Sequence, residues 1–301
     1  MSGKDRKGLV LPTFLVCGAQ KAGTTALYHA LRAHPDVCMS IPKETEFFNW
    51  RCRRGWKWFA SHFEHWNGET AIGEASTRTM PTPEAPGRIA ERMPDVKLLF
   101  VLRNPVERAH SAFWYYYTQG TLCPGTDFSE FIRNEGHPLR QEIIHYGFYD
   151  RHLTRFLDEF DRTQLLLLRY RDLRNHPDEE IKRICEFIGV TVNDAASPSD
   201  SENVTRYPAS RVLYTLAYRL WKPVDRFFSG WVEGRMEKIR RYGRKLFLQT
   251  ERLTLRDEDR EYLSRIYEPT KQRIQNDFDL DVSHWASGPT EQDVSEAGLG
   301  R

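Results

Sequence analysis

Two glycines with a lysine between them, Gly18, Lys21 and Gly23, stand near the beginning of the chain. An apolar run over residues 14–17 precedes them and an amphipathic pattern follows, which is the layout of a loop that holds phosphate through backbone N–H groups. In nucleotide triphosphatases the lysine directly follows the second glycine, but here that position holds Thr24. The spacing predicts a phosphate-binding loop whose ligand is not an ordinary nucleoside triphosphate.

A second cation, Arg103, follows the apolar run over residues 97–102. A triphosphatase has a magnesium-binding aspartate at the end of such a strand. An arginine at the carboxyl edge of a parallel strand favours an anion over a metal, and Ser111 on the next predicted helix can add a hydroxyl. The sequence therefore predicts a ligand with two anionic ends, one in the loop over residues 18–25 and one near Arg103 and Ser111, and no metal ion.

These residues require a scaffold, and short apolar runs alternate along the chain with longer helical patterns. This alternation predicts an α/β fold with a parallel β-sheet flanked by helices. The expected strands are residues 14–17, 37–40, 71–74, 97–102 and 165–169. The expected helices are residues 24–33, capped by Thr24, then 82–93, 105–117, 149–160 and 178–188, a helical region over 211–248 and a final amphipathic helix over 255–274.

Length and charge limit the remaining possibilities. With 301 residues and 40% hydrophobic content, the chain can form one sizeable core, so we expect a single domain over residues 10–286 and an acidic, solvent-exposed tail over 287–301. The net charge of +2 gives no ground for a nucleic-acid partner. A basic segment over residues 211–245 is the local exception, and it fits a polyanionic acceptor, a peripheral membrane contact or a solvated helix face.

The cysteines and the hydropathy bear on the cellular compartment. The chain has five cysteines and no CxxC pair, which argues against a disulfide framework and against a zinc site. We find no apolar run of about 18 residues and no signal-peptide core at the N-terminus. These observations predict a cytoplasmic protein.

Four segments, in the same order, resemble the sulfotransferases that use 3′-phosphoadenosine 5′-phosphosulfate (PAPS). GAQKAGTTAL (18–27) resembles their 5′-phosphosulfate loop, and LLFVLRNPVERAHSAFWYYY (98–117) resembles their 3′-phosphate segment. LLLLRYRDLRNHPDEEIKRICEFIGV (165–190) and NVTRYPASR (203–211) are similar to later parts of the family. The motifs are closest to those of the glycan, heparan sulfate-type members. The resemblance implies a P-loop nucleotide-kinase-like sulfotransferase fold and transfer of a sulfuryl group from PAPS, which leaves adenosine 3′,5′-bisphosphate (PAP).

The resemblance also implies which residues bind the donor. Those expected at the 5′-phosphosulfate are Lys21, Ala22, Gly23, Thr24 and Thr25. Those expected at the 3′-phosphate are Arg103, Ser111 and Arg206. Lys21 is expected to stabilise charge on the departing phosphate as well, and is therefore also a catalytic candidate.

The general base is expected in IPKETEFFNW (41–50). In the glycan-type members a glutamate three residues before a Phe-Phe pair is the base, and Glu44 has this spacing to Phe47 and Phe48. A carboxylate beside the donor loop can take the proton of an attacking hydroxyl. Glu46 is the alternative base.

The acceptor is left open by the sequence. A hydroxyl is expected, less often an amine, on a glycan, a lipid or a small metabolite. Ala75 and Met80 stand in a segment where glycan-type members often carry a lysine and a tyrosine, so their acceptor contacts do not transfer to this chain. His62 and His65 lie one turn apart on a predicted helix, but two histidines alone do not make a metal site.

Two other functions compete with sulfuryl transfer. A P-loop kinase or NTPase is opposed by Thr24 in the lysine position and by Arg103 in place of a metal-binding acid. A non-catalytic polyanion-binding protein would use the basic segment but would have no use for Glu44 beside a phosphate loop.

Overall fold

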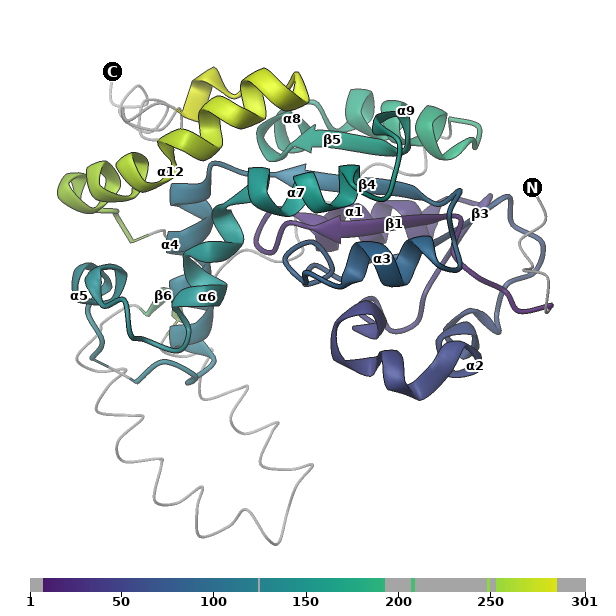
Figure 1. Ribbon diagram of the computed structural model, residues 1–301, viewed down its shortest axis with the longest axis horizontal. Coiled ribbons are helices and arrows are strands. Elements are labelled where there is room, and N and C mark those ends of the chain that lie inside the picture. Colours follow the sequence, from purple (N-terminus) through teal and green to yellow (C-terminus); the bar gives the residue numbers. More distant parts are fainter. Residues whose placement is uncertain (1–7, 124, 193–206, 209–247, 250–252, 286–301) are drawn as a thin grey trace, which may run out of the picture.

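The computed structural model describes residues 8–123, 125–192, 207–208, 248–249 and 253–285 (Figure 1). Five parallel strands form a sheet in the order β2-β3-β1-β4-β5. They are β1 (Phe14–Gly18), β2 (Val37–Met39), β3 (Ala71–Glu74), β4 (Lys97–Leu102) and β5 (Leu165–Arg169). A short antiparallel pair joins β6 (Tyr207–Pro208) to β7 (Leu248–Gln249).

Helices and helical turns connect the strands. The α-helices are α1 (Thr24–Ala33), α2 (Gly55–Ala60), α3 (Ala85–Ala90), α4 (Pro105–Thr118), α5 (Phe128–Arg133), α6 (Arg140–Ile143), α7 (Tyr149–Leu157), α8 (Tyr170–Asn175), α9 (Pro177–Ile188) and α12 (Asp257–Phe278). The shorter turns are η1 (Phe47–Arg51), η2 (Cys52–Arg54), η3 (Ser61–Phe63), η4 (His145–Gly147), η5 (Arg162–Gln164) and η7 (Ser283–Trp285). None of these helices has both the length and the apolar character needed to span a bilayer.

The central strands lie between two layers of helices. Figure 1 shows α3 and α7 over one face of the sheet and α1 over the other. β1 is buried along its whole length and β4 at every residue after Lys97, as expected of strands covered on both faces. The α/β fold with a parallel sheet flanked by helices is thus confirmed. Because β1 lies between β3 and β4, the carboxyl ends of these three strands meet where α/β sheets bind ligands.

A second apolar cluster forms where α4 packs against α5 and α12. It includes Phe113 and Trp114 on α4, Phe131 on α5, and Leu263 and Tyr267 on α12, all of them buried. This packing fixes α4, the helix that begins two residues after Arg103, relative to the sheet.

The predicted elements differ from the structure mainly at their ends. The helix expected over residues 82–93 is α3, which is shorter because Pro83 disfavours helical backbone at Thr82, while Pro86 fits the first turn. The final helix continues to Phe278 through Pro269, and its buried residues on both sides of the proline hold it against the fold. Arg206, the basic segment over residues 211–245 and the tail over 287–301 lie outside the described residues.

Candidate active site

The predicted phosphate loop joins the end of β1 to the beginning of α1. The N-cap of α1 is Gly23, which has the left-handed φ of 80° and no side chain with which to cap the helix. The expectation that Thr24 caps α1 is therefore wrong: Thr24 is its first helical residue, because glycine alone adopts this φ at no steric cost. The backbone at residues 22–25 lies at the helix N-terminus, whose partial positive charge suits an anion.

Gly23 also lies so close to a neighbouring ring that a side chain here would require the ring to shift. A Cβ atom there would lie 3.0 Å from Cε2 of Tyr170, the first residue of α8. The ring of Tyr170 also stacks on Arg103, with the guanidinium carbon 4.7 Å from the ring centroid. Tyr170 thus joins the phosphate loop to the ends of β4 and β5.

Lys21 is the cation inside this loop. Its backbone is left-handed, with a φ of 67°, and its Nζ lies 4.6 Å from the centroid of the Tyr115 ring. Burial, together with the positive charges of Arg103 and Lys43, lowers the pKa of Lys21 from 10.5 to about 8. A poorly hydrated ammonium group beside two other cations favours an anionic ligand.

Arg103 contacts the loop directly. Its Nη1 donates to the carbonyl oxygen of Lys21 at 3.1 Å, and its Nε and Nη2 donate to Glu107 Oε2 at 3.3 and 3.2 Å. A guanidinium has five N–H groups, and three of them are used in these bonds within the described part of the chain, so the other two are candidates for contact with a ligand. From the sequence, Arg103 was expected to contact the second anionic end of the ligand. In the structure it also supports the backbone of the phosphate loop, through its bond to the carbonyl oxygen of Lys21. Ser111 lies on α4 and is only 2% exposed.

Replacing Arg103 by alanine should weaken PAP binding by roughly 10- to 150-fold, because a charge-assisted contact contributes about 1.5–3 kcal/mol. Isothermal titration calorimetry measures this directly. Glu107→Gln removes the carboxylate that pairs with Arg103 but keeps the guanidinium. The affinity of this variant for PAP should therefore not fall. Arg265→Ala, on the surface of α12, is the matched control. Unchanged affinity in Arg103→Ala would refute its assignment to the 3′-phosphate.

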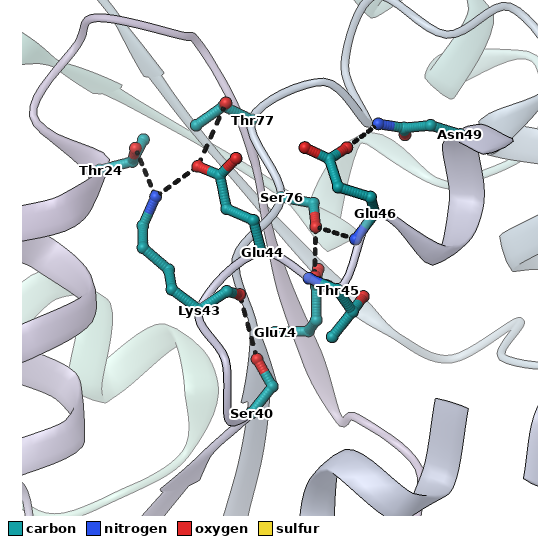
Figure 2. A network of polar contacts seen from close by, with 10 residues as sticks. All are labelled: Thr24, Ser40, Lys43, Glu44, Thr45, Glu46, Asn49, Glu74, Ser76 and Thr77. Carbon is teal, nitrogen blue, oxygen red and sulfur yellow. Dashed lines mark hydrogen bonds and ion pairs between the residues drawn. The ribbon is translucent and has the colours of Figure 1, made fainter. Parts of the chain in front are cut away.

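The predicted base, Glu44, lies beside the same loop (Figure 2). Lys43 connects the two, since its Nζ donates to Glu44 Oε1 at 2.7 Å and to the Thr24 hydroxyl at 3.4 Å. Thr77 Oγ1 also donates to Glu44 Oε1, at 3.4 Å. The side chain of Glu44 is 36% exposed, so the carboxylate remains accessible from solvent.

Glu46, the alternative base, lies on the same segment as Glu44, and the carboxylates of the two residues are neighbours (Figure 2). Its backbone is left-handed, with a φ of 56°, and Asn49 Nδ2 donates to its carboxylate. Burial raises the pKa of Glu46 to about 7, and the nearby Glu44 adds to this rise while Arg78 opposes it. Glu46 therefore holds a proton more readily than an ordinary glutamate.

A third carboxylate, Glu74, was not among the predicted site residues. It ends β3, is 1% exposed, and accepts hydrogen bonds from Thr45 and Ser76. Burial raises its pKa to about 7 against the opposing effect of these donors. The sequence did contain a signal for Glu74, because it is an acidic residue at the end of an apolar strand, on the edge where parallel sheets bind ligands.

A group of polar and aromatic side chains continues from the carboxylates, and two of its members, Arg78 and Trp50, were not among the predicted site residues. The Arg78 guanidinium lies 5.0 Å from the ring centroid of Trp50, which is 55% exposed. Nη2 of Arg78 donates to Glu142 at 2.9 Å and to the Tyr116 hydroxyl at 3.4 Å. Gln20, next to Lys21 in the loop, donates to the same hydroxyl at 3.1 Å. We call Arg78, Trp50 and Tyr116 the acceptor-side cluster.

The two histidines considered for a metal site contact backbone carbonyls. His62 Nδ1 lies 2.9 Å from the Trp58 oxygen, and His65 Nε2 lies 3.0 Å from the Met39 oxygen. Within the ranges that the structure describes, no group of three or more histidine, cysteine, aspartate or glutamate side chains is arranged so that it could hold a metal ion.

Comparison with known families identifies the family of the chain. Residues 11–241 match the sequence profile described as "Sulfotransferase domain". The chain belongs to the sulfotransferase family. This membership confirms the family resemblance seen in the sequence.

Relatives of this chain include much longer proteins. It is 33% identical over 199 residues to the Mus musculus "Bifunctional heparan sulfate N-deacetylase/N-sulfotransferase 4" and 32% identical over 197 residues to the Homo sapiens "Bifunctional heparan sulfate N-deacetylase/N-sulfotransferase 3". Each match covers 60% of this chain but 22% of the relative. The crystal structure of a sulfotransferase from Alicyclobacillus acidocaldarius superposes with a TM-score of 0.68 at 23% identity, over 91% of this chain and 98% of that one, which confirms the fold.

Proposed function

We propose that this protein transfers a sulfuryl group from PAPS to an acceptor hydroxyl, with an amine as the second choice. One observation carries the proposal: Lys43 connects Glu44, the predicted base, to Thr24 of the phosphate loop, with distances of 2.7 and 3.4 Å. A carboxylate is thus held where an acceptor would meet a donor bound in the loop. A simple phosphate-binding module has no need of this arrangement.

Donor binding divides between two groups of residues. The N–H groups of Ala22, Gly23, Thr24 and Thr25 and the ammonium of Lys21 would hold the 5′-phosphosulfate. Arg103, which uses three of its five N–H groups on described residues, would reach the 3′-phosphate together with Ser111. Arg206 stays a prediction for the same phosphate. No metal ion is needed in this scheme, because cationic side chains and backbone dipoles supply the positive field.

The reaction itself is an in-line displacement at sulfur. The acceptor oxygen forms a bond to sulfur while the bond between sulfur and the bridging oxygen of the 5′-phosphate breaks, and that electron pair leaves with PAP. Glu44 takes the proton of the acceptor hydroxyl as the new bond forms. Lys21 stabilises the negative charge that develops on the departing phosphate.

Nucleotide preference tests the donor assignment without an acceptor. PAP should stabilise the protein in the absence of metal, by about 2.7 kcal/mol at 100 times its dissociation constant. ATP should stabilise it less, because it has no 3′-phosphate for Arg103. A thermal-shift titration with PAP, ATP plus magnesium and 5′-AMP measures all three. Equal stabilisation by 5′-AMP and PAP would refute the 3′-phosphate site.

The affinity for PAP should fall as the pH rises from about 7 to above 8. Lys21, with a pKa of about 8, is charged below that pH and binds an anion best in this form. Glu46 and Glu74, with pKa values of about 7, become anionic as the pH rises and disfavour the same ligand. Calorimetry from pH 6.5 to 9 checks this trend, and Lys21→Met should remove the part centred near pH 8. An affinity that increases over this range would contradict the arrangement.

For the acceptor we propose a glycan, since the relatives named above carry heparan sulfate in their names. The acceptor-side cluster supports this choice. An exposed Trp50 offers an aromatic face to a sugar ring, and Arg78 beside it offers a cation to an anionic sugar. Lipids and small metabolites belong in the same screen with sulfur-labelled PAPS. Labelling of those alone would refute the glycan assignment, and labelling of a glucosamine amine would make this an N-sulfotransferase.

The cellular setting also stays a proposal. All five cysteines are free thiols, which suits a reducing compartment such as the cytoplasm. The segment over residues 211–245 is proposed to contact a polyanionic acceptor or a membrane surface. Fractionation of cells that express the tagged protein tests both ideas, and recovery in a secretory compartment would refute the cytoplasmic assignment.

A further inference from the structure

Glu74 is a carboxylate buried in the sheet, at a position where an apolar side chain would carry a smaller desolvation cost. It is 1% exposed at the end of β3, a strand otherwise made of alanine, isoleucine and glycine. Burying a carboxylate carries a large desolvation cost unless hydrogen bonds offset it. The hydrogen-bond partners of its Oε1 atom suggest why a carboxylate is found at this buried position.

Those partners belong to, or lead to, the loop that carries the proposed base. Oε1 accepts from the backbone N–H of Thr45 at 3.1 Å and from the Thr45 hydroxyl at 2.8 Å. It also accepts from the hydroxyl of Ser76, which in turn accepts from the backbone N–H of Glu46 at 3.0 Å. Figure 2 shows this chain from Glu74 through Ser76 to Glu46. One carboxylate therefore holds two successive peptide N–H groups, that of Thr45 directly and that of Glu46 through the Ser76 hydroxyl.

The same carboxylate is rigidly placed relative to the donor loop. β3 pairs with β1, with Glu74 opposite Leu15, and β1 runs directly into the loop that begins at Gly18. The side chain of Glu44 leaves the backbone immediately before Thr45, and that of Glu46 immediately after it. Two neighbouring strands of one sheet thus position both parts of the site. β1 leads into the phosphate loop, and β3 ends in Glu74, which holds residues 44–46.

We propose that Glu74 is a positioning residue that holds residues 44–46 in register with the donor loop, an inference that rests on the proposed function of Glu44. It touches neither donor nor acceptor and acts through Thr45 and Ser76. Reaction rates are sensitive to such placement, since an error of about 1 Å at a reacting group costs on the order of 10²-fold.

Amide hydrogen exchange followed by mass spectrometry tests the positioning without any substrate. In Glu74→Ala the amides of Thr45 and Glu46 should exchange at least about tenfold faster than in the wild type, because Thr45 loses its acceptor and the Ser76 hydroxyl, which is the acceptor of Glu46, loses the partner that orients it. Ser76→Ala should accelerate exchange at Glu46 while leaving Thr45 protected. Ile72→Val, a core truncation on the same strand, is the matched control and should leave both amides unchanged. Wild-type protection of both amides in Glu74→Ala would overturn the proposal.

Turnover and binding then separate this role from a merely structural one. Glu74→Ala should lower turnover by roughly 10²-fold with PAP affinity within about twofold of the wild type. Glu74→Gln keeps an acceptor oxygen at the same place and should recover most of the activity and of the amide protection. Should Glu74→Ala not fold, Ser76→Ala and Glu74→Gln carry the test, and normal exchange at Glu46 in Ser76→Ala would count against it. Failure of the wild type to bind PAP would instead refute the proposed function.

Discussion

We expect Glu44→Gln to lower turnover by roughly 10²–10⁴-fold while PAP affinity barely changes. Glutamine keeps the size of the side chain and an oxygen that can accept from Lys43 and Thr77, but it cannot take a proton. The 2.7 Å contact between Lys43 and Glu44 should therefore survive the change. Single-turnover measurements with sulfur-labelled PAPS, alongside calorimetry with PAP, separate chemistry from binding.

Glu46→Gln is the matched control for this result. Its carboxylate faces Glu44 and has a pKa of about 7, so near neutral pH glutamine resembles its protonated form. We expect a loss of activity much smaller than in Glu44→Gln. The reverse pattern would transfer the role of base to Glu46, and normal turnover in both variants would place the base elsewhere.

The second large effect is expected at Lys21. Lys21→Met should lower turnover by roughly 10²–10³-fold, because it removes a cation aimed at the charge that develops on the departing phosphate. PAP affinity should fall less, since the N–H groups of the loop and Arg103 remain. Methionine retains much of the length and of the apolar stem of lysine and removes only the ammonium group, which lies 4.6 Å from the centroid of the Tyr115 ring, so the fold should persist.

A surface lysine provides the comparison for Lys21→Met. Lys57→Met lies on α2, away from the loop, and should behave as the wild type in both turnover and PAP binding. Equal losses of turnover and of PAP affinity in Lys21→Met would mean that Lys21 binds donor and product alike without favouring the transition state. Such a result would contradict its catalytic role.

The sheet could be predicted from the sequence because each strand is a short, nearly continuous apolar run. β4 and β5 have the predicted ends, Lys97–Leu102 and Leu165–Arg169, since both are buried parallel strands bounded by polar residues. Helix ends were less predictable. At α1 the cap depended on the backbone φ of Gly23 rather than on the side chain of Thr24, and a φ value leaves no direct mark in a residue pattern.

The candidate site was predictable where its residues follow one another in the chain. Lys21, Arg103 and Glu44 could be selected from local motifs, and the structure brings them to one edge of the sheet. Glu74 and Arg78 were missed because their importance comes from partners far away in the sequence. Thr45 lies 29 residues from Glu74, and Glu142 lies 64 residues from Arg78. Hydrogen bonds over such separations are set by tertiary packing, which a local pattern does not encode.

The most direct test of the central claim is transfer of labelled sulfur from PAPS to an acceptor panel of glycans, lipids and phenols, with the release of PAP measured in the same reaction. We predict that the wild type releases one PAP for each sulfated acceptor and that Glu44→Gln does so at least about a hundredfold more slowly. Equal release by the wild type and Glu44→Gln would contradict the account, as would a wild-type protein that neither binds PAP nor transfers label while it hydrolyses ATP with magnesium.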